Sequence, residues 1–478
     1  MRCSLADVNL TESLLSQNAT PPPLPIATQD SSDASLSQKL DQVLDKVDLL
    51  LGVRKAVDMV ESEIDSGQDT PGLLDKLYFD VTPYRDVRRA ASLCQMPFSK
   101  ELAHGIWTPP PVRSPEEDIV GSGLIPEPLA NQLVSICVEY YGHWIAMYEL
   151  PPGFVNDLRV KCPMLLAVMC LLGLRYYKGP LLKNGNHLAR SLLQIMQRLL
   201  SASILVVPQI KYQIQSLLLI SLFAVSLSHQ SFYFDGWFLS GYGLLHYITR
   251  EMDLNLLSDR LRLHPDRNES FRLWNQMVLG HLVYCILSGR PCLIDTLRLD
   301  QCRNILEIPS ASSFDGRVVA QLSILLTLYN SLQFKEPLDV SLKDLKSSFN
   351  DWKHLLEQHS VGRPISITYR FAKVMLYRRD FLTTGDPKSA AELDGECEKL
   401  LGLIKDSDPI LLLKSSDHIK FVTMFAALTL IQHGKAATAR PAVDLFAAWE
   451  KTTVYYNDFA GVYRRLLETL SSTTSAQP

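Results

Sequence analysis

Apolar side chains recur every three or four residues through most of this chain, and this spacing constrains its fold more than any other feature. Prolines and glycines interrupt the pattern at intervals, as expected at helix ends. Long apolar-polar alternation, the mark of half-buried strands, is absent. We therefore predict an all-α fold, with helices at 129–148, 162–179, 186–203, 212–227, 238–255, 272–289, 318–333, 344–359, 365–382 and 392–405.

Two segments, 164–174 and 214–227, are apolar almost throughout. A membrane span needs about 20 such residues, and both are shorter. Gln215, Ser216 and Ser221 also interrupt the second segment. We interpret both as helices buried on all sides in a large helical core, and expect no membrane as a partner.

The composition changes along the chain and indicates where domains begin and end. Residues 1–35 are rich in Ser, Thr, Asn, Gln and Pro, which predicts disorder. A short helix is expected at 36–64 and a large helical domain at 73–470. A stretch rich in proline at 108–128 interrupts this domain, and a disordered tail is expected at 471–478.

The short helix has the spacing of a coiled coil. Its apolar residues are four, three, four and three positions apart, which places them on one stripe of a helix. They are Leu36, Leu40, Val43, Val47 and Leu50. The clean pattern covers only about two heptads, fewer than a confident coiled coil requires. The stripe therefore predicts either a homodimer or a helix that packs on its own domain.

We find no pattern that indicates catalysis, a cofactor or a metal ion. The histidines include no His-Glu-x-x-His pair, and no glycine-rich phosphate loop occurs. The nine cysteines contain no Cys-x-x-Cys pair. Cys285 and Cys292 have one spacing used in zinc clusters, but Cys285 lies in an apolar helical segment. Such cysteines are typical of reduced thiols packed in a core, so no metal site and no enzyme activity are predicted.

The charge of the chain is not that of a protein that holds DNA by itself. Its formal net charge is −4, whereas phosphate contacts require clustered Lys and Arg. Short basic groups such as Arg378 and Arg379 are more typical of solvated helix faces. We therefore expect the isolated chain to bind duplex DNA weakly or not at all.

The segment 269–295 resembles the signature of the fungal-specific transcription factor domain, the helical middle region of fungal zinc-cluster regulators. Its Arg272, Leu273 and Trp274 match the first part of the motif, and a Gly-Arg-Pro triplet follows at the expected distance. The family motif residues are thus Arg272, Trp274, Gly289, Arg290 and Pro291. Asn275 replaces a second tryptophan, and His281 with Leu282 replaces an Asp-Arg pair.

The residues themselves indicate structural roles for this motif. Trp274 is expected in the core, and Gly289 with Pro291 is expected to end the helix. Arg290 is expected to cap exposed carbonyls or to pair with an acid such as Asp295.

The resemblance implies a nuclear regulator of transcription for a fungal gene set or biosynthetic gene cluster. It also implies a homodimer or a partner transcription factor. The six-cysteine cluster that reads DNA in this family is not visible, so DNA would be reached only indirectly or through a cluster lost from the N-terminal side. Two alternatives are an all-helical enzyme and an interaction scaffold. An apolar cleft that contains convergent polar groups would favour a ligand-gated regulator or an enzyme, whereas a packed interior would favour a scaffold.

Overall fold

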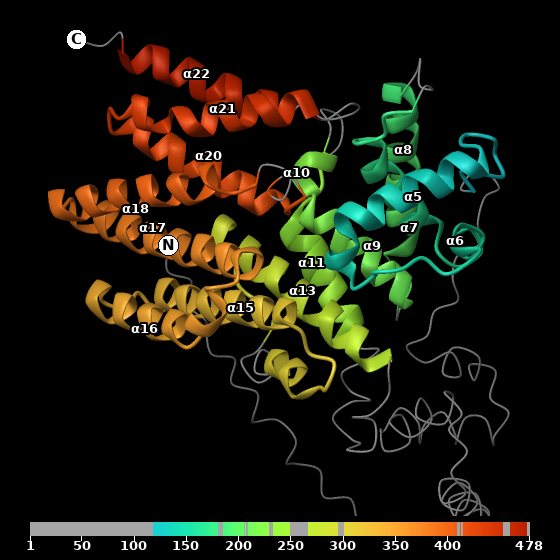
Figure 1. Cartoon of the computed structure of the whole chain (residues 1–478), viewed down its shortest axis with the longest axis horizontal. Coiled ribbons are helices and arrows are strands. Elements are labelled where there is room, and N and C mark those ends of the chain that lie inside the picture. Colours follow the sequence, from blue (N-terminus) through green and yellow to red (C-terminus); the bar gives the residue numbers. More distant parts are fainter. Residues whose placement is uncertain are drawn as a thin grey trace, which may run out of the picture. The chain divides into compact units, whose positions relative to one another are not determined.

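The computed structural model divides the chain into two units, Met1–Leu74 and Asp75–Pro478, and all residues that it describes belong to the second (Figure 1). The described residues are 118–179, 185–204, 206, 209–228, 233–248, 266–294, 301–408, 412, 414–452 and 459–475. The predicted N-terminal disorder, the heptad stripe from Leu36 to Leu50 and the residues 73–117 lie outside them.

Helices make up the described part of the chain, in which no strand occurs, and the predicted all-α class is confirmed. The first half contains α5 (Glu127–Tyr141), η2 (Gly142–Ile145), α6 (Phe154–Lys161), α7 (Pro163–Leu174), α8 (Gly185–Ser203), α9 (Lys211–Leu222), α10 (Ala224–Leu227), α11 (Gly236–Tyr247) and α13 (Asp266–Ser288). The second half contains η5 (Gln301–Glu307), α15 (Ser313–Gln333), α16 (Leu338–Asn350), η6 (Lys353–Leu355), α17 (His359–Thr384), α18 (Pro387–Lys405), α20 (Asp417–Gln432), α21 (Ala436–Thr452) and α22 (Phe459–Ser475).

Helix α7 is central to the first half. It packs against α5, α6, α8 and α9, and each of its residues is buried. A helix that is apolar on every face needs neighbours on every face, and these four supply them. The apolar segment 214–227 is buried as well, but it breaks at Phe223 into α9 and α10. Both predicted buried helices are thus confirmed, and no helix in the described ranges has the length and hydropathy to cross a membrane.

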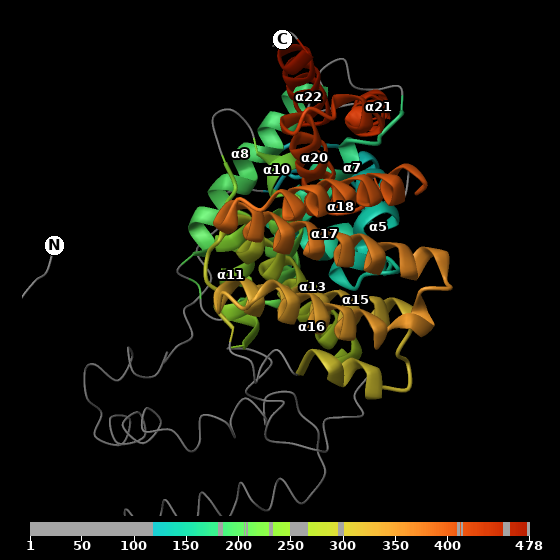
Figure 2. The same ribbon diagram turned by 90° about the vertical axis from the view of Figure 1, so that its left-hand side faces the viewer.

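The second half is a succession of helices that pack on their neighbours. The contacts run from α15 to α16 and α17, then to α18, α20, α21 and α22 (Figures 1 and 2). Helix α13 joins the two halves, because it packs against α9 and α11 on one side and α15 on the other. One apolar core, extending from Ile119 to Leu467, runs through both halves.

A buried polar cluster also ties the halves together. Asp417 at the start of α20 accepts hydrogen bonds from the backbone N and the Oγ of Ser226, at 2.7 and 2.8 Å. The Lys420 Nζ lies 3.3 Å from the same carboxylate, and Arg175 donates to the Ser226 carbonyl at 3.3 Å. Burial lowers the pKa of Lys420 to about 8, although Asp417 opposes the shift. Asp417 and Lys420 are thus buried as a hydrogen-bonded ion pair, the form in which proteins tolerate buried charges.

Helix limits differ from the predicted ones at several places. The helix predicted at 129–148 ends at Tyr141, because the chain turns through η2 and a left-handed Ala146 with φ 54°. Its start, Glu127, lies inside the predicted break at 108–128. At the other end, α22 continues to Ser475, five residues beyond the predicted limit of 470. Hydroxyls there donate to carbonyls of the preceding turn, as Ser471 does to Leu467 at 2.7 Å, so a polar composition is compatible with a helix.

Candidate functional site

Helix α13 carries Arg272 and Trp274 of the family motif and is buried over much of its length. Every residue from Leu273 to Val283 is buried, because α9, α11 and α15 surround the helix. Trp274 is 1 % exposed, and its ring centroid lies 5.2 Å from that of Tyr247 in α11. Asn275, at the place of the family's second tryptophan, donates from Nδ2 to the Cys302 carbonyl at 2.9 Å. It therefore binds the η5 backbone rather than filling the core with a second ring.

Arg272 connects α13 to the start of α15. Its Nε and Nη2 lie 2.9 and 3.0 Å from the two carboxylate oxygens of Asp315, and Nη2 also donates to the Ser310 carbonyl at 3.0 Å. Asp315 forms a capping box with Ser312 at the N-terminus of α15. Burial alone would raise the pKa of Asp315, but hydrogen bonds from Arg272 and Ser312 lower it overall. The carboxylate thus serves both a helix cap and a bidentate ion pair.

The Gly-Arg-Pro triplet forms the turn after α13 and fastens it to α11. Gly289 has φ 69°, a left-handed conformation that suits glycine at the end of a helix. The Arg290 Nη1 lies 2.5 Å from an oxygen of Asp235, and its guanidinium stacks 5.1 Å from the ring of Trp237. The Trp237 indole N–H donates in turn to the Pro291 carbonyl at 3.0 Å.

Through these contacts, Arg272, Trp274 and Arg290 join α13 and the turn after it to neighbouring helices. Arg290 pairs with the acid Asp235, the N-cap of α11. Asp295, the acid suggested from the sequence, lies outside the described residues. The motif residues themselves do not converge on one site. Arg272 binds near the start of α15, while Arg290 binds at the start of α11.

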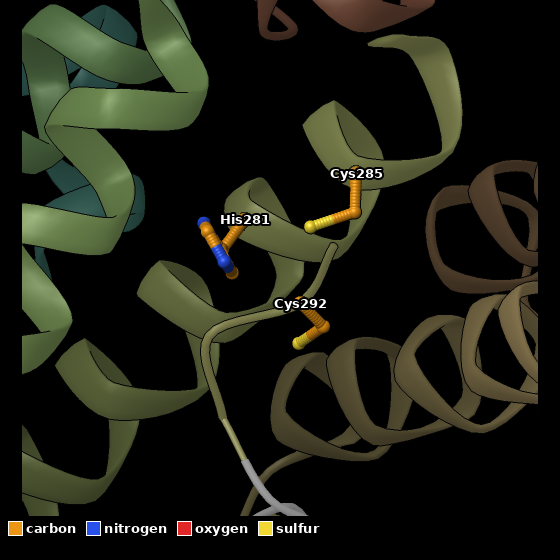
Figure 3. Close-up of side chains that lie close together, drawn as sticks. All are labelled: His281, Cys285 and Cys292. Carbon is orange, nitrogen blue, oxygen red and sulfur yellow. The ribbon is translucent and has the colours of Figure 1, made fainter. Parts of the chain in front are cut away.

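A histidine and two cysteines meet beside this turn. Figure 3 shows His281 and Cys285 on α13 and Cys292 on the segment that follows it. One ligand atom of each residue lies within 4.8 Å of the other two. His281 and Cys285 are buried, whereas Cys292 is half-buried. The Cys285 thiol lowers the pKa of Cys292, although burial opposes the shift. These three side chains are the one group in the described ranges whose donor atoms converge as metal ligands do.

The sequence analysis did not bring these three residues together. It treated Cys285 and Cys292 as core thiols, and it noted His281 only as a departure from the family pattern. A signal was present, because residues four apart share one face of a helix and the turn at Gly289 reverses the chain immediately afterwards. The apolar residues around Cys285 indicated a core thiol, and His281 carried no ligand spacing of a known zinc motif.

A surface groove lies at the other end of α13. It has a volume of ≈ 790 Å³ and is bordered by residues 146–151, which follow η2, by α6 and α9, and by Glu269. Tyr148 and Tyr212 supply aromatic surface, and Lys211 forms an ion pair with Glu269. The groove is therefore lined by both charged and apolar side chains.

Comparison with known proteins assigns this helical region to a family. Residues 123–443 match the family model described as the middle domain of the transcriptional activator of proteases prtT. The protein of that name from Aspergillus clavatus is 30% identical over 264 residues, which cover 54% of this chain and 41% of that protein. The one from Penicillium rubens is 27% identical over 66% of this chain and 49% of its own length.

A third relative, an uncharacterized transcriptional regulatory protein of Schizosaccharomyces pombe, is 26% identical over 66% of this chain and 61% of its own length. The chain thus matches about half the length of these curated relatives, and no solved structure matches it. The resemblance to a fungal transcription factor domain is confirmed. The chain belongs to the family defined by the middle domain of the transcriptional activator of proteases prtT.

Proposed function

We propose that this protein regulates transcription of a fungal gene set and is not an enzyme. The observation that carries this proposal is the family match over residues 123–443, which spans α5 to α20 and enters α21. The match thus includes whole packed helices from both halves, not a short motif. The relatives are named as transcriptional activators or regulators, and those named prtT as activators of proteases. Protease genes are therefore the first targets to measure.

The charge of the chain supports an indirect contact with DNA. With 47 basic and 51 acidic side chains, it lacks the positive excess that nonspecific phosphate binding requires. We propose that the protein acts in the nucleus and reaches DNA through a partner transcription factor or a separate zinc-cluster module. The stripe Leu36, Leu40, Val43, Val47 and Leu50 is the proposed dimerisation element.

The groove beside α13 supports a regulator that responds to a small molecule. Its lining includes Glu149, two tyrosines, and two lysines that are ion-paired, Lys161 with Asp157 and Lys211 with Glu269. This combination suits a polar ligand with an apolar part. The groove also borders the helix that carries the family motif, so a ligand there would contact the element that joins the two halves.

Deletion of the gene, followed by transcript profiling, tests the proposal. We expect a defined set of transcripts to change in the deletion strain and to return when the full chain is expressed again. The Trp274→Ala variant is the negative control. Its re-expression should not restore the transcripts, because this change is expected to destabilise the regulatory domain. Unchanged transcripts in the deletion strain, under conditions in which the wild type contains the protein, would contradict the proposal.

A further inference from the structure

We propose that His281, Cys285 and Cys292 bind one thiophilic metal ion, of the class of Zn²⁺ and Cu⁺. The inference is independent of the proposed role in transcription. It stands on three donor groups that converge within 4.8 Å at the junction of α13, α11 and α15. Two sulfur atoms and one imidazole nitrogen form a soft donor set, which favours these ions over Mg²⁺ or Ca²⁺.

The fold supplies two donors from α13 and the third from the segment that follows it. His281 and Cys285 are four residues apart on α13 and share one face of the helix. Cys292 reaches this face because Gly289 reverses the chain. The backbone N–H of Cys292 donates to the Tyr329 hydroxyl of α15 at 2.8 Å, which fixes the end of the turn. The Arg290–Asp235 ion pair fixes its beginning. The arrangement is therefore built before any ion arrives.

Hydrogen bonds around His281 set its tautomer. The Ser240 hydroxyl donates to the Trp237 carbonyl at 3.1 Å, so toward the His281 Nδ1, 3.0 Å away, it can only accept. The Nδ1 consequently carries the proton and the Nε2 presents a lone pair. This lone pair accepts the backbone N–H of Leu293, next to Cys292, at 3.2 Å. A histidine that donates through one nitrogen to a fixed partner and presents the other is typical of metal ligands.

Binding requires only a small contraction of the cluster. Metal–sulfur bonds of about 2.3 Å and metal–nitrogen bonds of about 2.0 Å place tetrahedral ligand atoms about 3.5–3.8 Å apart. From separations within 4.8 Å, the atoms therefore move together by about 1.3 Å or less. Each thiol gives up its proton to solvent, and the Leu293 hydrogen bond to Nε2 breaks. Cys292 is half-buried, so water can reach the fourth position that Zn²⁺ prefers, while Cu⁺ needs three ligands only.

Metal analysis of the full chain tests the site. The protein is purified under reducing conditions, loaded separately with Zn²⁺ or Cu⁺, passed over a desalting column and measured by mass spectrometry. We expect the wild type to retain about one equivalent of metal more than the Cys285→Ala and Cys292→Ala variants. Cys397→Ala is the matched control, because Cys397 is a buried thiol of α18 outside the cluster. Retention of Zn²⁺ indicates a site completed by water, and retention of Cu⁺ alone indicates a three-coordinate site.

A second variant leaves all three ligands in place. Ser240→Ala removes the acceptor that fixes the His281 tautomer, and we expect metal affinity to fall about 10- to 100-fold. Ser216→Ala is its control, since Ser216 is equally buried and donates to the carbonyl three residues earlier, Gln213, at 2.7 Å. Chelator competition measures both affinities. If Ser240 had only a structural role, Ser240→Ala and Ser216→Ala should have the same metal affinity.

Protection of Cys292 in the wild-type chain provides a test without substitutions. Metal loading is expected to slow its alkylation by maleimide, mapped by mass spectrometry, relative to the metal-free protein. Three results would overturn the proposal: a wild type that retains neither ion, Cys285→Ala and Cys292→Ala variants that retain as much as Cys397→Ala, or Cys292 alkylation that metal does not change.

Discussion

Replacing Trp274 by alanine is expected to remove a large part of the stability of the helical domain. The side chain is 1 % exposed and packs against Tyr247 between α13 and α11. A buried tryptophan removes about 150–250 Å² from water, which corresponds to about 4–6 kcal/mol at about 25 cal/mol per Å². This is an upper value, because the unfolded chain already buries part of its apolar surface.

Another contribution reduces the cost. The indole Nε1 is buried and has no hydrogen-bond partner among the residues that the structure describes. Burying an unpartnered N–H costs about 1–3 kcal/mol, which the substitution recovers. We therefore expect Trp274→Ala to lower the free energy of unfolding by about 3 kcal/mol, near the lower end of typical tryptophan truncations. Trp274→Phe removes fewer buried atoms and also loses the unpartnered N–H, so it should cost less than Trp274→Ala.

Urea unfolding followed by far-UV circular dichroism measures these changes. At a slope of about 3 kcal/mol per M, the alanine variant should shift the midpoint by about 1 M. Phe334→Ala is the control, because Phe334 is 73% exposed and its loss should change stability by about 0.5 kcal/mol or less. Equal midpoints for Trp274→Ala and Phe334→Ala would refute the reasoning.

Three further predictions follow from glycine geometry, a buried carboxylate and the heptad stripe. Gly289→Ala should lower the free energy of unfolding by about 1–2 kcal/mol, because φ is 69° at this residue. Gly395→Ala, inside α18, should raise it by about 0.5–1 kcal/mol, because the added Cβ would meet open space. Thermal unfolding of both variants measures the contrast. Burial would raise the pKa of Glu396, but hydrogen bonds from Lys373, Arg370 and Lys399 lower this pKa overall. The Glu396 carboxylate therefore stabilises the fold above the pKa it has in the unfolded chain, and this stabilisation is lost as pH falls through its pKa in the folded protein. Glu396→Gln should therefore flatten the loss of stability below about pH 4.5 in urea titrations, and an unchanged slope would contradict this. Changing Leu40 and Val47 together to Asp should dissociate a dimer seen by light scattering, and a monomeric wild type at high concentration would exclude the dimer.

The all-α fold could be predicted from the sequence because helix periodicity is a local property. Segments 164–174 and 214–227 are apolar on every face, and only a buried position is compatible with that pattern. Helix ends were less predictable. Ala146 adopts a left-handed conformation that no local residue preference indicates, and the hydroxyls near Ser471 bind their own helix rather than ending it.

The contacts of the motif could not be predicted, since they join residues far apart in the sequence. Arg272 binds Asp315, and Arg290 binds Asp235, which is 55 positions earlier. Ion pairs at such separations leave no periodic signal. The cluster of His281, Cys285 and Cys292 is different, because its spacing within one helix and turn is local. The spacing of Cys285 and Cys292 is one used in zinc clusters, but the apolar residues around Cys285 indicated a core thiol instead.

Recruitment of the chain to a reporter promoter tests most directly whether it regulates transcription. The full chain is fused to a heterologous DNA-binding domain in a fungal reporter strain, and reporter transcripts are measured against the DNA-binding domain alone. We predict that the fusion changes reporter transcription, that Trp274→Ala weakens the change and that Phe334→Ala retains it. A wild-type fusion that is present in the nucleus and leaves reporter transcription unchanged would contradict the account.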